Sequence, residues 1–166
     1  FSCQTKKSEK SLTEKLDFAE ELEIEGLEVS GGSKPYEKIE AYEQALSGRS
    51  IQLASICGQS TFDWLDPDPK KRQASIAESK RNLEVCGHFA AAGHIVPPIF
   101  GPPRLPDLSP LKTAIELEKE LLVEIVIDLA AFAASKNTLL LLEPLNRYEQ
   151  HLLRRQADGI EIIERA

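Results

Sequence analysis

One short run limits the fold of this chain more than any other, the segment TLLLLE at residues 138–143. Apolar side chains at successive positions are typical of a parallel strand that is covered on both faces of its sheet. The run ends on the carboxylate of Glu143, and a proline follows at once. An unpaired buried carboxylate costs several kcal/mol, so this side chain is expected to have a cation or a proton as its partner.

The rest of the sequence alternates short apolar runs with longer helical patterns. Strands are expected at 1–4, 26–30, 51–57, 94–98 and 138–143, and helices at 11–22, 36–46, 66–92, 111–136 and 152–166. Asp66 and Asp68 favour the positive end of the third helix, and Pro69 fits its first turn. Alternating units of this size predict an α/β fold with a parallel sheet and right-handed crossovers. The pattern alone leaves two closures open, a doubly wound sheet and part of a (β/α)₈ barrel.

Composition narrows the classes of partner. The 166 residues carry a formal net charge of −7, whereas a general nucleic-acid surface needs clustered lysines and arginines. No uncharged apolar stretch reaches the roughly 20 residues that span a bilayer. Three widely spaced cysteines (Cys3, Cys57 and Cys86) form neither a disulfide framework nor a CxxC pattern, which predicts reduced thiols in a cytoplasmic protein. We therefore expect one domain over residues 1–166, with neither nucleic acid nor a membrane as partner.

The carboxyl ends of the predicted strands hold the residues that could carry chemistry, because functional groups gather there in either closure. Glu143 ends one strand, and Glu149 lies in the loop that follows it. Cys57 and Gly58 close the strand at 51–57, and Phe100 follows the strand at 94–98. These five residues are the candidates for a site.

Several polar residues near these ends also have structural interpretations. Glu143 could form an ion pair with the nearby Arg147, and Glu28, inside a strand, is interpreted as structural. The chain has three histidines, His88, His94 and His151. The first two are interpreted as structural, because one ends a helix and the other begins a strand at the wrong end for a barrel site. The role of His151 stays open.

The segment LLLLEPLNRYE, residues 139–149, resembles the strand-five motif of the sugar phosphate isomerase/epimerase family, the xylose isomerase-like TIM barrels. The ketose 3-epimerases of the tagatose and psicose 3-epimerase type are the most similar group. Other segments occur where that family would place them: GLEVS (26–30), ASICG (54–58), DPDPKKRQASI (66–76) and HIVPPIFG (94–101). The resemblance covers nearly the whole chain, and the strand-five motif is its most specific part.

The resemblance implies a (β/α)₈ TIM barrel of which about five βα units are present, and an isomerase that acts on a sugar or sugar phosphate through an enediolate. Glu143 would be a ligand of a divalent metal ion (Mn²⁺, Mg²⁺ or Co²⁺) and one of two acid/base carboxylates. Glu149 would hydrogen-bond the sugar, and Cys57, Gly58 and Phe100 would line the pocket. Assembly into a homo-oligomer is a further expectation.

The sequence departs from the family in one respect. The family takes its other metal ligands, an aspartate, a histidine and a second glutamate, from strands six to eight, and this chain contains no such strands. The 166 residues are therefore expected to be part of a longer protein or a truncated barrel. Alternatives on the same scaffold are hydroxypyruvate isomerisation, inosose dehydration, endonuclease IV-like cleavage, or a non-catalytic barrel fragment.

Overall fold

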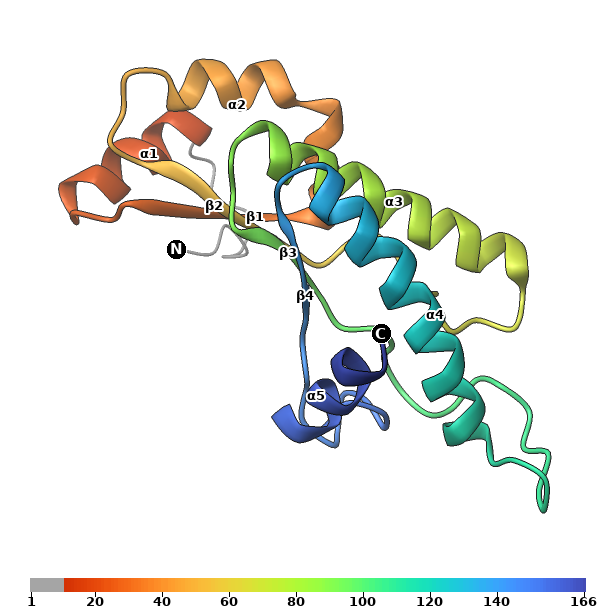
Figure 1. Cartoon of the computed structure of the whole chain (residues 1–166). Coiled ribbons are helices and arrows are strands. Elements are labelled where there is room, and N and C mark those ends of the chain that lie inside the picture. The colour runs from red at the N-terminus through yellow and green to blue at the C-terminus, as the bar shows by residue number, and fades with distance from the viewer. Residues whose placement is uncertain (1–10) are drawn as a thin grey trace.

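Within residues 11–166, four parallel strands form a single sheet. The structure is a computed structural model that describes residues 11–166. The strands are β1 (Gly26–Ser30), β2 (Gln52–Cys57), β3 (Gly93–Val96) and β4 (Leu139–Leu142), and they neighbour one another in the order β1-β2-β3-β4 (Figure 1). The expected strand at 1–4 lies outside the described residues. Sequential order without reversal is the arrangement of a barrel and not of a doubly wound sheet.

The strand positions predicted from the apolar runs are confirmed to within two residues. Leu27 pairs with Leu53, His94 with Ile56, and the Gly93 end of β3 with the Leu139 end of β4, all in parallel register. β3 ends at Val96 and does not reach residue 98, because two prolines follow and proline lacks the N–H that a ladder needs.

A helix follows each strand, as a right-handed β/α succession requires. The helices are α1 (Leu12–Glu21), α2 (Ile39–Leu46), α3 (Pro69–His88), α4 (Ala114–Ser135) and α5 (Gln156–Arg165), with short 3₁₀ turns at Gly31–Ser33 and Pro35–Glu37. The long helices α3 and α4 pack against each other and over the sheet (Figure 1). No helix within residues 11–166 has the length and apolar character needed to cross a membrane.

Local sequence explains where these helices begin. Ser11 and Glu14 form a capping box at α1, and Thr113 and Glu116 form another at α4. Asp68 accepts a hydrogen bond from the Lys70 N–H at the start of α3, as the sequence predicted for this helix.

Five helix boundaries differ from the prediction by three residues or more, and one of them is the start of α3, at Pro69 and not at 66. α2 begins at residue 39 and not 36, because residues 35–37 form a separate 3₁₀ turn. α3 ends at His88 and not at 92, because Ala90 adopts a left-handed φ of 52° that turns the chain toward β3. α4 begins at residue 114, where the Thr113 cap sets its start, and α5 begins only at residue 156.

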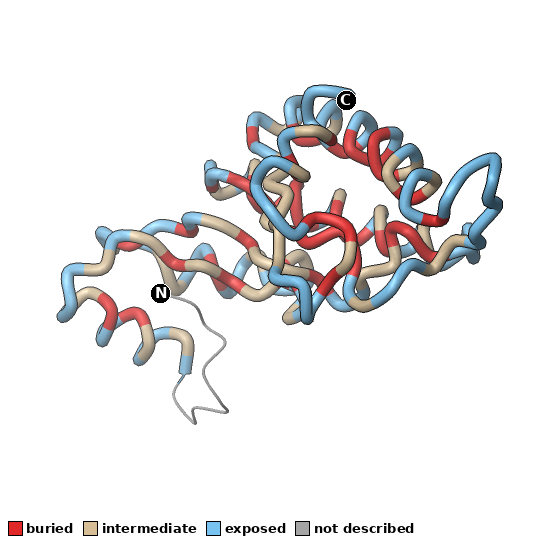
Figure 2. Tube along the Cα trace, turned by 90° about the horizontal axis from the view of Figure 1, so that it is seen from below, coloured by how far each residue is buried: buried red, intermediate tan, exposed pale blue. Residues whose placement is uncertain are grey.

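The described residues form two apolar core clusters, and Figure 2 shows buried residues gathering between the sheet and the covering helices. One cluster surrounds α4 and includes Leu122, Leu129 and Ile162. The other joins α1 to β1 and β2 and includes Leu16 and Ile56.

The strand that most constrained the fold is less buried than its sequence predicts. We expected β4 to be covered on both faces, but Leu139 is 60% exposed and the next three leucines are only half-buried. β4 is an edge of the described sheet, so one side of it has no neighbouring strand among these residues. The prediction of complete cover for 138–143 is wrong for this segment.

Candidate functional site

Acidic side chains converge at the carboxyl ends of the strands. Glu143 directly follows β4, and its backbone N–H continues the ladder by donating to the Val96 carbonyl at 3.1 Å. Burial raises the pKa of the Glu143 carboxyl, and the carboxylates of Glu28 and Glu149 raise it further. The carboxylates of Glu28 and Glu149 therefore both lie within electrostatic range of Glu143.

Cys57, the last residue of β2, belongs to the same group. Burial raises the pKa of its thiol to about 11, with further contributions from Glu28 and Glu143. The thiol is consequently neutral at physiological pH and can act as a small, weakly polar wall of the site. Glu28, interpreted from the sequence as structural, accepts a hydrogen bond from the Ser55 hydroxyl at 3.1 Å, and its charge contributes to the raised pKa of both Cys57 and Glu143.

Arg147 does not neutralise Glu143. Its guanidinium donates to the Tyr148 hydroxyl at 2.7 Å and lies over the Tyr148 ring, with 4.9 Å between Cζ and the ring centroid. No ion pair within residues 11–166 involves Glu143. The structural alternative for this glutamate, an ion pair with Arg147, is therefore absent from the described part of the chain.

Glu149 is exposed and is held by its own loop. Its carboxylate accepts a hydrogen bond from the side-chain amide of Asn146, and its backbone carbonyl accepts from the Gly101 N–H at 2.7 Å. The side chain of Gln150 is buried and donates to the Glu143 carbonyl at 3.2 Å. The loop after β4 is thus connected to the end of β4 and to the loop after β3.

Gly58 and Phe100 are linked through Phe62, a residue that sequence reasoning did not select. The Phe62 and Phe100 rings meet edge to face with 4.7 Å between centroids. A Cβ at Gly58 would lie 3.5 Å from Phe62 Cζ, and Gly58 itself has a left-handed φ of 71°. Gly58 also donates its N–H to the Ile95 carbonyl at 2.8 Å, which fixes the turn after β2.

The histidines have three different environments. His88 pairs with Glu43 at 2.8 Å on the surface, and His94 is buried with Nδ1 3.1 Å from the Ile56 carbonyl. Burial lowers the pKa of His94 to about 4, so its ring is neutral. His151 lies between Gly101 and the fully buried Glu118 of α4, a residue that the sequence gave no reason to select.

The described residues supply few ligands for a metal ion. Within residues 11–166 no three His, Cys, Asp or Glu side chains are grouped closely enough to hold one. The cluster nevertheless favours a cation, because Glu143 is crowded by two other carboxylates and has no basic partner there. The donor set therefore fits one ligand of an oxygen-preferring divalent ion and not a complete site.

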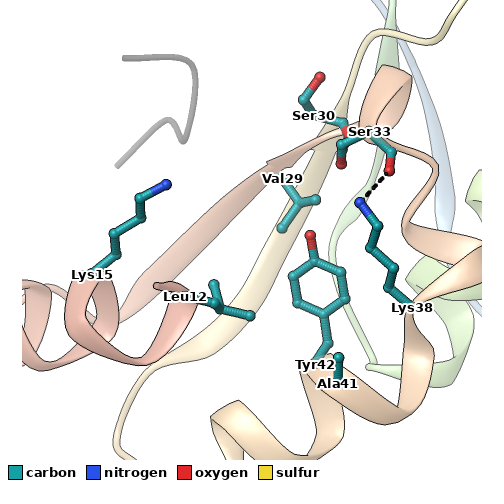
Figure 3. A pocket seen from close by; sticks show the side chains of 8 residues that line it. All are labelled: Leu12, Lys15, Val29, Ser30, Ser33, Lys38, Ala41 and Tyr42. Atoms are coloured by element: carbon teal, nitrogen blue, oxygen red, sulfur yellow. Dashed lines mark hydrogen bonds between the residues drawn. The ribbon is translucent and has the colours of Figure 1, made fainter. Parts of the chain in front are cut away.

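A separate hollow of about 330 Å³ lies between α1, the end of β1 and α2 (Figure 3). Val29 and Tyr42 form part of its wall, and Lys38 donates to the Ser33 carbonyl at 3.0 Å beside it. None of the five candidate residues lines this hollow.

Comparison with known proteins identifies the class. A sequence profile of the Xylose isomerase-like TIM barrel family matches residues 16–166, so the chain belongs to this family. Among characterised relatives, 3-dehydro-D-guloside 4-epimerase of Escherichia coli K12 is 26% identical over 157 residues, which cover 92% of this chain and 58% of that protein.

Solved structures show the same fold. The apo form of 3-keto-D-glucoside 4-epimerase from E. coli superposes with a TM-score of 0.83 at 23% identity, covering 99% of this chain and 62% of that one. D-psicose 3-epimerase from Clostridium cellulolyticum with D-tagatose gives 0.75 at 18% identity, with coverages of 94% and 54%. A barrel protein of this family from Mycobacterium smegmatis, in complex with magnesium, gives 0.64 at 15% identity, with coverages of 92% and 51%.

The sequence-based resemblance and the barrel fold are thus confirmed. The chain spans between about half and three fifths of the length of these proteins. The roles of the individual site residues remain predictions.

Proposed function

We propose that the protein containing this chain is a sugar epimerase or isomerase that moves a proton on the carbon next to a carbonyl group. The observation that carries the proposal is Glu143, a carboxylate with a raised pKa and no basic partner among the described residues, at the carboxyl end of a strand in this family of barrels.

The names of the similar enzymes support this reaction class. A ketose 3-epimerase inverts the carbon beside a C2 carbonyl, and a 4-epimerase of a 3-keto sugar inverts the carbon beside a C3 carbonyl. Both reactions remove a proton α to a ketone and return it on the other face. The proposed substrate class is therefore a ketose, a ketose phosphate or a keto-glycoside.

In this proposal Glu143 is the base that accepts the proton. A carboxylate whose pKa is raised by burial and by neighbouring charges is a stronger base than a free one, which favours proton abstraction near neutral pH. Glu149, exposed in the adjacent loop, would hydrogen-bond the sugar. Cys57, Gly58 and Phe100 would line the pocket.

Glu143 would also be one ligand of a divalent metal ion. When bound, such an ion supplies Lewis-acid stabilisation of negative charge on the substrate oxygens. A single carboxylate does not hold a catalytic ion, so the remaining ligands would come from residues beyond those described, as would the second carboxylate that returns the proton.

Substitution of Glu143 by glutamine in the full-length protein tests the proposal. The amide keeps the shape and one oxygen but loses the charge and most of the basicity, so turnover should fall roughly 10²-fold or more. The assay is epimerisation of a panel of ketoses, ketose phosphates and 3-keto sugars with added Mn²⁺, followed together with incorporation of solvent deuterium at the reacting carbon.

Glu124→Gln is the matched control, because Glu124 is an exposed residue in the middle of α4 and does not lie at the carboxyl end of a strand. Its activity should equal that of the unmodified protein. Full activity in Glu143→Gln would end the case for Glu143 as base and metal ligand.

A further inference from the structure

We propose that His151 is a positioning residue: its protonated ring joins the buried carboxylate of Glu118 to the Gly101 carbonyl and holds the two loops of the candidate site in register. These are the loop after β3, which carries Phe100, and the loop after β4, which carries Glu149. The effect on catalysis rests on the proposed function, whereas the register itself does not.

The two nitrogens of the ring have well-defined partners on different elements. Nδ1 lies 2.8 Å from the Gly101 carbonyl, and Nε2 lies 2.5 Å from Oε2 of Glu118 on α4. The His151 side chain is only 15% exposed and that of Glu118 is fully buried. The contact therefore joins segments 33 and 50 residues apart in the sequence inside the protein.

These partners determine the protonation state of the ring. A carbonyl and a carboxylate are both acceptors, and a neutral imidazole has only one N–H to donate. With Glu118 as a carboxylate, the form that can accept from two backbone N–H groups and from the ring at once, both contacts are satisfied together only if both ring nitrogens carry protons. The geometry therefore points to an imidazolium paired with the Glu118 carboxylate, a charge-assisted contact of the stronger kind.

The other oxygen of Glu118 holds the loop after β3 directly. Oε1 accepts from the backbone N–H of Arg104 at 2.6 Å and from that of Leu105 at 3.3 Å. The Arg104 guanidinium is directed elsewhere, to Asp63 at 2.6 Å and Asp66 at 3.6 Å. His151 is thus the basic side chain that meets this buried carboxylate.

Gly101 also contacts the loop after β4 through its own backbone. Its N–H donates to the Glu149 carbonyl at 2.7 Å, and it forms an isolated parallel bridge with Gln150. Gln150 in turn donates to the Glu143 carbonyl. One connected chain of hydrogen bonds therefore runs from α4 through His151 and Gly101 to the end of β4.

Stability alone is a weak explanation for this arrangement. Removing two charges from water costs several kcal/mol per ion, and apolar residues of similar volume often replace such pairs without loss of stability. The burial of a charge on α4 is explained if the His151–Glu118 pair fixes the position of the loop after β3 relative to the loop after β4. The expected benefit is a site whose lining residues are held in place before substrate binds.

Nitrogen NMR of the histidine rings tests the protonation state in the full-length protein without any assay of activity. At pH 7 the His151 ring should show protons on both nitrogens, whereas the buried His94, whose pKa is lowered to about 4, should be neutral and serve as the internal reference. In Glu118→Gln the His151 ring should lose one of these protons. A neutral His151 ring in the unmodified protein at pH 7 would overturn the inference.

Hydrogen exchange and kinetics test the positioning role. His151→Gln can donate to one partner but not to both, so exchange of the Gly101, Arg104 and Leu105 amides should become at least about tenfold faster. kcat/KM should fall roughly 10- to 100-fold, mostly through KM, because Glu143 stays attached to β4 while the lining residues lose their register.

His88→Gln is the matched control, because His88 contacts a carboxylate only at the surface, and it should leave the exchange rates and KM unchanged. Unchanged amide exchange and KM in His151→Gln would overturn the inference even if Glu143 proves essential. If the unmodified protein epimerises no sugar, the proposed function fails, but the ring protonation and the exchange rates still decide the role of His151. Should His151→Gln not fold, the spectrum of the unmodified protein decides.

Discussion

Replacement of Gly31 by alanine should destabilise the protein by forcing apart the two strands that end at the candidate site. Gly31 follows β1 and lies against Gly58, which follows β2. A Cβ at this position would lie 2.9 Å from the Gly58 carbonyl carbon, closer still to its oxygen, and 2.7 Å from Nδ2 of the buried Asn82. Separations under 3.0 Å are essentially never seen for real Cβ atoms, so the surroundings must move.

The size of the effect follows from the nature of the obstacle. Overpacking of a well-packed interior typically costs about 1–3 kcal/mol. Here two of the three nearest atoms belong to the backbone, and no change of rotamer moves a backbone carbonyl. We therefore expect a loss near the upper limit, about 3 kcal/mol, which corresponds to a decrease of roughly 6–12 °C in Tm for a protein of this size.

Thermal and urea unfolding followed by circular dichroism measure this change, and Gly159→Ala is the matched control. A Cβ at Gly159 in α5 would meet Pro144 Cγ at 3.6 Å, an ordinary contact. Alanine is about 1 kcal/mol better than glycine in a helix, so this variant should gain roughly 2–4 °C in Tm. The reasoning is refuted if Gly31→Ala unfolds at the same temperature as the unmodified protein, or if the two variants shift Tm in the same direction.

Two further predictions concern ionisation at the site. The rate at which the Cys57 thiol reacts with iodoacetamide should rise with a midpoint near pH 11 and not near the ordinary 9.0, as mass spectrometry of its peptide would measure. Glu143→Gln should lower that midpoint, because it removes one of the charges that raise the pKa of the thiol. A midpoint at or below 9 in the unmodified protein would contradict the raised pKa. The raised pKa of Glu143 means that the folded protein binds this proton more tightly than the unfolded chain, so its contribution to stability is present below the ordinary value of 4.5 and is lost as pH rises through the folded value. In chelator, Glu143→Gln should therefore melt higher than the unmodified protein at pH 7.5 and show no such advantage at pH 4, whereas a lower Tm at pH 7.5 would indicate a structural partner for the carboxylate.

Much of this fold can be predicted from local patterns. The four described strands follow from short apolar runs, and the start of α3 follows from Asp68 and Pro69, because these signals act over a few residues. The end of α3 could not be found in this way. The segment FAAAG contains good helix formers and no stop signal before its glycine, yet Ala90 turns left-handed so that the chain can enter β3.

The candidate site could be predicted only in part. Glu143, Glu149 and Cys57 are selected by their positions at or after strand ends, and Glu143 lies within electrostatic range of Cys57, Glu149 and Glu28. The pairing of Glu118 with His151 could not be predicted, because a glutamate in the segment AIELEKELL looks like one more residue on the solvated face of a helix. Its contact with His151 depends on the loop after β4, which lies 33 residues later in the sequence.

The leucine-rich strand also has consequences for solubility. β4 presents an apolar segment at an edge of the described sheet, and Leu139 is 60% exposed. Edges of this kind are templates for intermolecular pairing, and natural sequences limit such pairing with charges and prolines on either side. Here Lys136 precedes the strand, and Glu143 and Pro144 follow it. The same carboxylate that we propose as the catalytic base is therefore also one of the charged residues that flank this edge of the described sheet.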